Sequence, residues 1–546
     1  MSAYLFKALV TSVLCVSSTI AYASRYGELP NLLDATVDEL ALGLNNGYFS
    51  SVDLVNAYTK RIIEVNATLH MVTELNPDAL QIATELDEER AAGKCRGPLH
   101  GLPILIKNNI ATYDEMNNTA GSYALLGAKV PRDATVAAKL RKAGAVILGK
   151  SNLSQWANFR HSNSSNGWSA HGGQTYGAYY PGQDPSGSSS GSGVSSSLGL
   201  AVASLGTETD GSIISPSQMN NLVGIKTTVG LTSRALVIPI SEHQDTVGPM
   251  ARTVKDAAYV LQAIAGPDQY DNYTSAIPFN GSLPDYVAAC KLDSLKGKRI
   301  GVPRNYIGAR SPTRAPILDA FEAALSVLRE AGATIVENTN YTAYEQYQNS
   351  EAEGTVLSAD FVANLQSYLS QLTVNPNSIH KLLDARSFTQ SYPPEQYPVR
   401  NTAIWDEALS LNFTNTSPEF WAAYQEDLYL GGPGGILGAL ANYSLDAVVT
   451  PSYVSPGISA IIGAPVVTVP LGSYPANTTV RTNSRGDLNA TAPGIPFGIS
   501  FSGALWSEEA LIGFAYAFEQ RTNVRKKVKP YLAPNTELLD VLGGCV

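Results

Sequence analysis

Short apolar runs bounded by glycine or proline alternate with helical patterns along most of this chain, and this alternation constrains its fold most. The run within Gly97–Ile110 and the run Ala145–Gly149 are apolar at nearly every position. Such runs are typical of strands buried on both faces. Between them, Ala134–Ala143 has the spacing of a helix. Strands and helices in this order predict an α/β layer structure.

The same pattern continues toward both ends of the chain. Helices are predicted to begin at or cover Ala35–Leu40, Ser51–Leu54, Asp78–Ala92, Ala315–Gly332 and Ser507–Gln520, and strands to cover Arg299–Val302, Asp446–Pro451 and Ala464–Pro470. Residues 341–435 are aromatic-rich, helical and less regular, which indicates a variable insertion. From length alone, 546 residues would divide into about three or four domains.

The N-terminal segment has the layout of a secretory signal peptide. Lys7 precedes a moderately apolar stretch, and Ala21–Ala23 forms a small-x-small cleavage site. We therefore expect residues 1–23 to be cleaved after Ala23 and the protein to be secreted. An uncleaved anchor is disfavoured because the stretch is short and rich in serine and threonine. No other segment has the apolar length of a membrane span.

Charge and sequons restrict the surroundings in which this protein works. The net charge of −10 and the lack of a Lys/Arg cluster argue against nucleic acid or an anionic membrane as a partner. Together with the signal peptide, the Asn-x-Ser/Thr sequons predict a glycoprotein. They include Asn66, Asn117, Asn163, Asn272, Asn280, Asn340, Asn412, Asn442, Asn477 and Asn489. A further sequon at Asn152 lies in a segment expected to be buried.

Cysteines and histidines give little support to a metal centre. Cys95, Cys290 and Cys545 remain after signal removal, which permits one disulfide of any pairing and one free thiol. Neither the cysteines nor the six histidines have the spacing of metal ligands. We expect no metal and no other cofactor.

A serine hydrolase with a histidine base is one alternative. Gly187–Gly191 formally matches the G-x-S-x-G motif of α/β-hydrolases. That motif follows a strand and needs a late histidine. Tyr179–Ser186 instead has the composition of a loop, and no histidine follows His380. In a stretch so rich in serine and glycine, we consider the match accidental.

A hydrolase with a lysine base fits the sequence better. Lys107 ends the apolar run Leu102–Ile106, where a lysine is commonly an ion-paired or snorkelling residue. Burial can also leave such an amine neutral and able to act as a base. It would then need a serine partner. Asp184–Pro216 supplies two Ser/Gly-rich turns on either side of the apolar run Leu198–Leu205.

These segments together resemble the amidase signature family. Its pattern is a lysine at a strand end, a Gly-Ser-Ser-Gly loop and a G-T-[DE]-x-x-G-S-I-x-x-P segment. The chain has GLPILIKNNI, SGSSSGSG and Gly206–Pro216 in the same register. Within the family, Gly206–Ile213 and Lys150–Phe159 are most similar to the peptide amidases. Two positions depart from the broader family: Asp210, where glycine is common, and Ile214, where arginine is common.

The resemblance implies a fold and a domain plan. The fold is α/β, a large mixed sheet sandwiched by helices in one domain over residues 24–546. Its catalytic core covers about 97–265, and the variable helical region covers about 341–435. This single domain stands against the several domains that length suggests.

The resemblance also implies the site residues. Ser212 is the nucleophile, Ser188 the bridging serine with a cis peptide bond before it, and Lys107 the base. The oxyanion hole consists of the backbone N–H groups of Thr209, Asp210, Gly211 and Ser212. Trp156, Asn158 and Ser189 are expected to line the substrate site, as is Phe159, although core packing is an equal alternative for Trp156, Asn158 and Phe159. Asp245 and Gln174 would support the loops.

We therefore expect a secreted amidase, a monomer that acts on carboxamides through a Ser-Ser-Lys triad and an acyl-enzyme. Peptide C-terminal amides and small amides are the expected substrates. Three alternatives remain at this point: an amidotransferase-like subunit that needs partner chains, a tailoring amidase for a secreted small metabolite, and a non-catalytic secreted binding protein. The signal peptide opposes the first of these, and the presence of Lys107 and both serines opposes the last.

Overall fold

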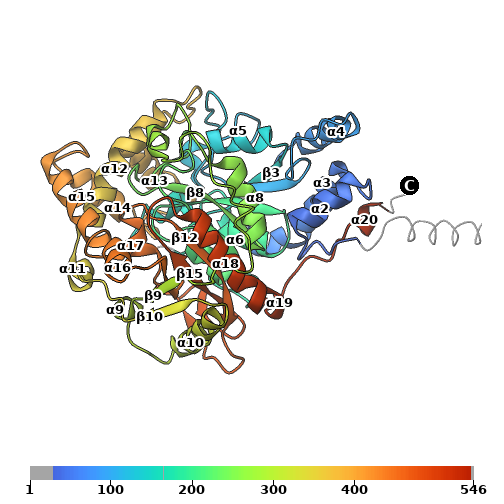
Figure 1. Cartoon of the computed structure of the whole chain (residues 1–546). Helices are drawn as coiled ribbons and strands as arrows, with labels where there is room; N and C mark the ends of the chain where they lie inside the picture. The colour runs from blue at the N-terminus through green and yellow to red at the C-terminus, as the bar shows by residue number, and fades with distance from the viewer. Residues whose placement is uncertain (1–28, 164, 543–546) are drawn as a thin grey trace, which may run out of the picture.

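A computed structural model describes residues 29–163 and 165–542 (Figure 1). Its centre is an eleven-stranded sheet in the order β1-β3-β2-β6-β8-β7-β12-β15-β11-β9-β10. The strands are β1 Val72–Leu75, β2 Pro103–Lys107, β3 Val146–Ser151, β6 Ala203–Glu208, β7 Val223–Lys226, β8 Thr246–Ala251, β9 Arg299–Val302, β10 Thr334–Glu337, β11 Ala447–Pro451, β12 Val466–Ser473 and β15 Pro496–Ser502. Two small ribbons pair β4 (Trp168–Ser169) with β5 (Gly173–Gln174) and β13 (Arg481–Thr482) with β14 (Asn489–Thr491).

The sheet is mixed, as expected. Strand β2 runs parallel to both β3 and β6, and β9 runs parallel to both β10 and β11. The strands between these two groups pair antiparallel, including β6 with β8 and β12 with β15. Every residue of β2, β3, β6 and β8 is buried. Burial on both faces explains why their sequences show no alternation of apolar and polar residues.

Helices pack on the sheet and surround it. They are α2 Val37–Asn45, α3 Ser51–Leu69, α4 Ala79–Ala91, α5 Thr135–Lys142, α6 Ser190–Ser197, α7 Ile214–Met219, α8 Val254–Ile264, α9 Arg304–Ile307, α10 Ala315–Glu330, α11 Tyr344–Asn349, α12 Ala352–Leu369, α13 Leu382–Ser391, α14 Ala403–Ser410, α15 Pro418–Gly431, α16 Ile436–Asn442, α17 Pro456–Ala460, α18 Glu508–Thr522, α19 Val524–Lys527 and α20 Leu539–Leu542. Short 3-10 turns cover Tyr123–Leu125, Gln155–Asn158, Asn272–Ala276 and Pro393–Glu395. Helices α5, α8, α18 and α10 contact one another in sequence along the sheet.

Local signals in the sequence explain where the first helices begin. Thr36 and Glu39 form a capping box at the start of α2, and Ser50 and Asp53 form one at the start of α3. In each box the hydroxyl and the carboxylate satisfy backbone N–H groups that the helix itself leaves unpaired. The helices and strands predicted from periodicity are present close to their expected bounds.

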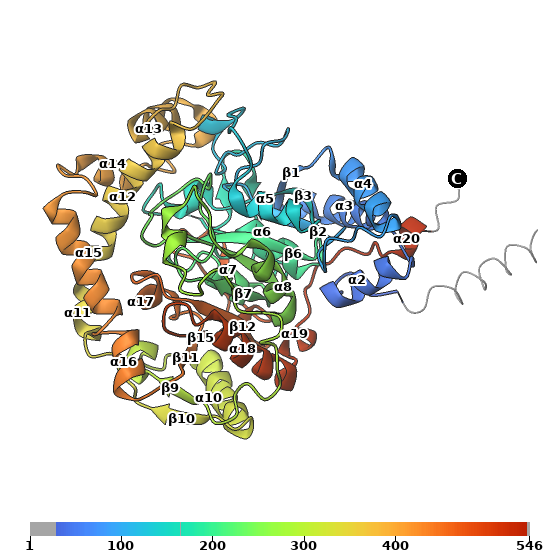
Figure 2. The same ribbon diagram turned by 45° about the horizontal axis from the view of Figure 1, so that its top comes forward.

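The division into several domains that length suggests is wrong. One hydrophobic cluster extends from Leu32 to Leu538. The chain reaches its size by adding strands to one sheet, and two smaller clusters, which include Leu430 and Phe420, accompany the main one. Residues 341–435 add no strand to that sheet. They form α11–α15, which lie along one side of it (Figure 2).

The Ser/Gly-rich stretch is a helix, whereas the sequence indicated a turn. All eight residues of α6 are buried. Serine and glycine have modest helix propensity, but their small side chains let this helix approach neighbouring backbone closely. A Cβ on Gly191 would overlap the carbonyl oxygens of Met71 and Asn152. The Ser192 hydroxyl donates a hydrogen bond to Leu205 O at 2.9 Å, which fixes α6 against β6.

Several expectations fall outside the described residues or remain open. The signal peptide 1–23 and Cys545 lie outside them. Cys95 and Cys290 are free thiols in the described part of the chain. Asn152 is fully buried, as its segment predicts. The described part contains no helix with the length and apolar character to cross a bilayer.

Candidate active site

Lys107 is the last residue of β2 and is fully buried. Its amine donates hydrogen bonds to Ser188 Oγ at 2.8 Å, to Thr207 Oγ1 at 2.9 Å and to Thr207 O at 3.1 Å. The parallel pairing of β2 with β6 explains this meeting, because it brings the carboxyl ends of the two strands together. In the described residues, none of the ion pairs involves Lys107, so the interpretation as an ion-paired lysine does not apply.

The amine of Lys107 is suited to be neutral near pH 7. Burial lowers the pKa of Lys107 to about 7, whereas the charges of Asp245 and Glu208 raise it. An amine with such a pKa can accept a proton at physiological pH.

A lowered pKa alone does not distinguish Lys107 from other buried lysines. Burial also lowers the pKa of Lys150 to about 7 and that of Lys226 to about 8. Lys150 donates to Ile110 O at 2.5 Å and Asn118 Oδ1 at 2.7 Å, and Lys226 donates to Ala464 O at 2.6 Å. Of these three lysines, Lys107 is the one whose amine touches a serine hydroxyl.

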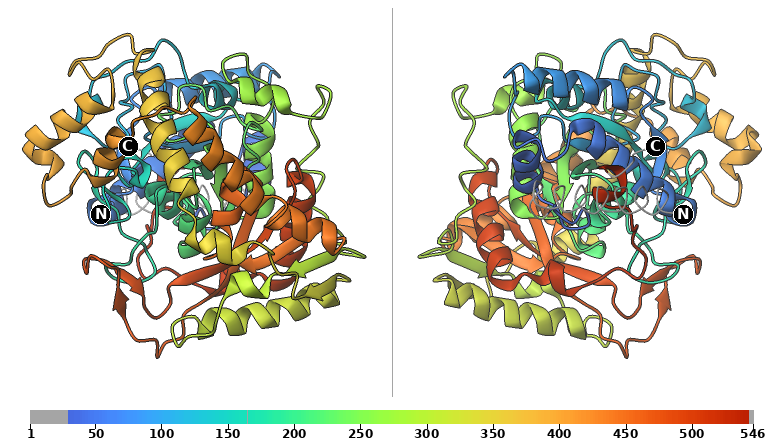
Figure 3. Two further views of the ribbon diagram at one scale, coloured as in Figure 1. Left: turned by 90° about the vertical axis from the view of Figure 1, so that its left-hand side faces the viewer. Right: turned by 90° about the vertical axis from the view of Figure 1, so that its right-hand side faces the viewer.

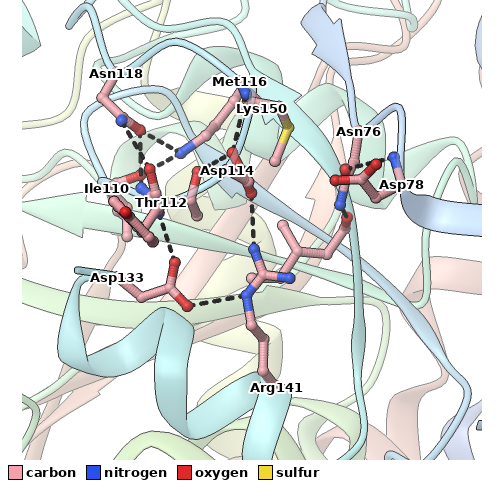
Figure 4. A network of polar contacts seen from close by, with 12 residues as sticks. Asn76, Asp78, Ile110, Thr112, Asp114, Met116, Asn118, Asp133, Arg141 and Lys150 are labelled. Carbon is pink, nitrogen blue, oxygen red and sulfur yellow. Dashed lines mark hydrogen bonds and ion pairs between the residues drawn. The ribbon is translucent and has the colours of Figure 1, made fainter. Parts of the chain in front are cut away.

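Lys150 instead holds the loop that follows Lys107 (Figure 4). It binds both ends of the segment 110–118, as its two hydrogen bonds show. Arg141, in α5, forms ion pairs with Asp114 at 2.7 Å and Asp133 at 3.0 Å beside this segment. The network thus fixes the chain immediately after β2.

Ser188 lies at the start of α6 and is fully buried. The Gly187–Ser188 peptide bond is cis, as the resemblance implies. A Cβ on Gly187 would overlap the Ser154 hydroxyl, so glycine is required by the close approach of that side chain. Ser188 Oγ and Lys107 Nζ lie 2.8 Å apart, so the hydroxyl can accept from a charged amine or donate its proton to a neutral one.

Ser212 lies on the loop after β6 and is 8% exposed. Its carbonyl oxygen accepts a hydrogen bond from Ser189 N at 3.1 Å, and Ser189 Oγ donates to Thr207 O at 3.1 Å. These bonds place the Ser188 and Ser212 segments side by side. No direct hydrogen bond joins the two hydroxyls in the described structure. Catalytic hydrogen bonds are often long before substrate binds.

Glu208 and Gly211 shape the loop that carries Ser212. Glu208 Oε2 accepts hydrogen bonds from Ile213 N at 2.6 Å and Ile214 N at 2.8 Å. Gly211 has φ +80°, and a Cβ there would lie 2.9 Å from Ser215 Oγ. A left-handed φ and this crowding both favour glycine.

The backbone of this loop offers hydrogen-bond donors. Within the described residues, the N–H groups of Thr209, Asp210 and Ser212 have no hydrogen-bond acceptor. Neighbouring free N–H groups in a glycine-containing turn can converge on one anion. Asp245 supports the loop, because its carboxylate accepts from Thr209 Oγ1 at 2.6 Å and from Ile240 N at 2.8 Å.

Three of the residues expected to line a substrate site have different surroundings. Trp156 is 2% exposed and packs edge-on against Trp405, with 5.5 Å between ring centroids. Ser189 is fully buried and binds the chain itself. Asn158 is partly buried, and its amide donates to Asn166 Oδ1 at 3.0 Å. The core-packing alternative therefore describes Trp156, and a lining role stays a prediction.

Two residues near Lys107 were missed in the sequence. Thr207 gives the amine two of its three acceptors, and Asn109 donates to Thr207 Oγ1 at 3.0 Å. Thr207 stands within the motif but has no distinctive chemistry of its own. Its importance follows only from the pairing of β6 with β2.

This arrangement defines an enzyme class. A buried amine of lowered pKa, a hydroxyl bonded to it, a second serine on the adjoining loop and free N–H donors are the parts of a hydrolase that cleaves amides without histidine. A family model described as Amidase matches residues 53–512. The chain belongs to the amidase family and is an amide-hydrolysing enzyme.

Relatives support this assignment. A "Putative amidase" of Arthroderma benhamiae is 55% identical over 536 residues, covering 94% of this chain and 90% of that protein. Native peptide amidase from Stenotrophomonas maltophilia is 38% identical, with a TM-score of 0.81, covering 92% of this chain and 99% of that one. A glutamyl-tRNA(Gln) amidotransferase subunit of Thermosynechococcus vestitus is 30% identical, covering 89% of this chain and 98% of that protein.

Proposed function

We propose that the protein is a secreted amidase that releases ammonia from carboxamides, with peptide C-terminal amides as the leading substrate class. Lys107, Ser188 and Ser212 form its catalytic triad. The observation that carries the proposal is the 2.8 Å hydrogen bond from the buried Lys107 amine to Ser188 Oγ. The likeness to the peptide amidase of Stenotrophomonas maltophilia supports the substrate class.

The reaction begins with attack of Ser212 Oγ on the carbonyl carbon of the amide. The Ser212 proton passes to Ser188 Oγ, and the Ser188 proton passes to Lys107 Nζ, which becomes an ammonium group. The carbonyl oxygen becomes an oxyanion that the free N–H groups of the Thr209–Ser212 loop stabilise. Removing one donor of this kind typically costs about 10²–10³ in rate.

Collapse of the tetrahedral intermediate needs the same protons in reverse. Lys107 returns a proton through Ser188 to the amide nitrogen, the C–N bond breaks, and ammonia leaves. The acyl group stays on Ser212 as an ester. A water molecule then attacks that ester, passes its proton along the same relay, and releases the carboxylic acid with Ser212 restored.

Ammonia release from a panel of amides tests the substrate class. Peptide amides, short free amides and long-chain fatty amides would be compared at equal concentration with the mature glycoprotein. We expect peptide amides to be hydrolysed fastest. Equal or faster turnover of the other amides would replace peptide amides by that class.

An amidotransferase-like role is the second candidate, favoured by the similarity to a glutamyl-tRNA(Gln) amidotransferase subunit. In that role the chain would need partner chains for activity. Full activity of the purified chain alone on a peptide amide would exclude this role. A tailoring amidase for a secreted metabolite is a third candidate, which the same panel would reveal as poor turnover of every peptide amide.

The pH dependence of the rate follows from the role of Lys107. Only the neutral amine can accept a proton, and its pKa is about 7. With a neutral substrate, kcat/KM should therefore rise about tenfold per pH unit below pH 7 and level off above pH 8. A rate that stays constant from pH 5.5 to pH 8 would contradict the assignment of Lys107 as the base.

A further inference from the structure

Asp210 occupies an unusual position in the loop before Ser212. It is exposed, whereas Thr209 and Gly211 on either side are buried. Protein nevertheless surrounds it closely enough that burial is the main cause raising the pKa of its carboxyl group. The Asp210 side chain is thus accessible from solvent, and the charges around it act on its carboxyl group.

Glu353 is held beside this loop. It lies in the first turn of α12, and its carboxylate accepts a hydrogen bond from Gln244 Nε2 at 2.9 Å. Asp245, which follows Gln244 in the chain, accepts a hydrogen bond from Thr209 Oγ1. Two adjacent residues therefore connect Glu353 to the Asp210 loop. The charge of Glu353 raises the pKa of Asp210.

A third carboxylate approaches from α15. Asp427 is 2% exposed, and its Oδ2 atom is buried with no hydrogen-bond partner in the described structure. Helices α12 and α15 lie side by side (Figure 3, left; yellow and orange). Their ends are joined by a hydrogen bond from Ser350 Oγ to Glu426 Oε1 at 2.9 Å. The charge of Asp427 also raises the pKa of Glu353.

None of the three carboxylates has an ion-pair partner in the described structure. Burial is the largest cause that raises the pKa of Glu353 and of Asp427, each to about 7. Glu208 also raises the pKa of Asp210, and the buried Lys226 lowers it. An unpartnered buried carboxyl group is costly unless something binds it.

We propose that Asp210, Glu353 and Asp427 bind a cationic nitrogen on the acyl part of the substrate, so that carboxamides of basic compounds are preferred. This proposal rests on the proposed function. Because ammonia is the leaving group there, a second, charged nitrogen has to belong to the acyl part. Its position beside Asp210, two residues before Ser212, places the cation close to the reacting amide.

An organic cation suits the three acids better than a metal ion. Among the described residues, Glu242, His243 and Asp360 have ligand atoms within 4.8 Å of one another, as a metal site requires. The three acids Asp210, Glu353 and Asp427 do not form such a group. Aromatic rings also adjoin them. Burial is the main cause that raises the pKa of the Tyr347 phenol. The charges of Tyr306 and of all three carboxylates raise it further. A phenol ring can stabilise an ammonium or guanidinium group through its face.

Paired substrates test the proposal on the intact protein. Nα-acetyl-lysinamide would be compared with Nα-acetyl-norleucinamide, and Nα-acetyl-argininamide with Nα-acetyl-citrullinamide, by ammonia release at pH 8. We expect kcat/KM to be at least about tenfold higher for the cationic member of each pair. Glu353→Gln and Asp427→Asn should each lower that ratio by about fivefold or more. Ratios near one, or ratios that neither variant changes, would overturn the proposal.

A matched control separates local from general effects of charge. Glu419 lies in the first turn of α15, the helix that carries Asp427, and is exposed. Glu419→Gln removes the same charge from the same helix and should leave the ratio unchanged. An equal fall in this variant would mean that long-range charge, rather than the three acids, sets the preference.

Binding without turnover distinguishes this proposal from the proposed function. Ser212→Ala protein would be titrated calorimetrically with acetyl-lysinamide and acetyl-norleucinamide in two buffers of different ionisation enthalpy. At pH 6.5, where the acids are partly protonated, the cationic ligand should bind more tightly and release protons. Tighter binding would support the proposal even if no amide were hydrolysed. Equal binding with no proton release would contradict it even if hydrolysis were fast.

Discussion

Ser212→Ala should abolish amide hydrolysis while the fold stays intact. Removing the hydroxyl prevents formation of the acyl-enzyme, and loss of a nucleophile of this kind lowers kcat by about 10⁴-fold or more. The free energy of unfolding should change by less than about 0.5 kcal/mol, because the hydroxyl makes no hydrogen bond in the described structure. Ammonia release and thermal unfolding of the same preparation would measure both effects. Turnover within tenfold of the original rate would rule out Ser212 as the nucleophile.

Two serines of the same region serve as controls for this variant. Ser195 lies in α6 with a buried hydroxyl that has no partner in the described structure, so Ser195→Ala should retain activity. Ser189 is the serine that the G-x-S-x-G interpretation would make the nucleophile. The Ser189 hydroxyl donates to Thr207 O rather than contacting Lys107, so Ser189→Ala should lose activity only as far as that contact is disturbed.

Lys107→Met should be almost as damaging to catalysis. The methionine keeps most of the volume of the lysine but cannot accept a proton from Ser188. Loss of a general base typically lowers kcat by about 10²–10⁴-fold. The remaining rate should also lose the rise between pH 6 and pH 7. Single-turnover measurements would show whether acylation is the step that slows.

Lys150→Met is the matched control for the loss of a buried lysine. Lys150 has the same lowered pKa but holds the 110–118 segment rather than a serine. We expect this variant to be destabilised by about 1–3 kcal/mol, because Ile110 O loses its donor. Its activity per folded molecule should stay within a few-fold of the original. If Lys150→Met and Lys107→Met lost activity equally, neither lysine could be singled out as the base.

The sequence predicts the strand ends well. Lys107 follows a continuous apolar run, and such runs are recognisable because strands buried on both faces do not alternate between apolar and polar residues. The register of the two Ser/Gly-rich segments identifies Ser188 and Ser212 through a family resemblance. It does not reveal that the parallel pairing of β2 and β6 makes Thr207 an acceptor for the amine.

Other features depend on tertiary packing and could not be predicted in this way. Helix α6 forms from residues of modest helix propensity, because only small side chains fit between β6 and the Met71–Asn152 backbone. Glu353 and Asp427 lie in the least regular part of the sequence. Their place relative to the Asp210 loop depends on the packing of α12 against α15, and contacts between residues so far apart in the chain leave no local sequence pattern.

The pKa of the Lys107 amine, measured in the folded protein, tests the central claim most directly. The ε-carbon of lysine labelled with ¹³C would be followed by NMR as pH is raised, and the Lys107 signal assigned by its absence in Lys107→Met. Comparison with the Lys150→Met spectrum separates the other buried amine that titrates in this range. We expect a pKa of about 7, so that a substantial fraction of the amine is neutral near pH 7 and can accept a proton from Ser188. A Lys107 pKa above 10 would show a charged amine at working pH and contradict the proposed mechanism.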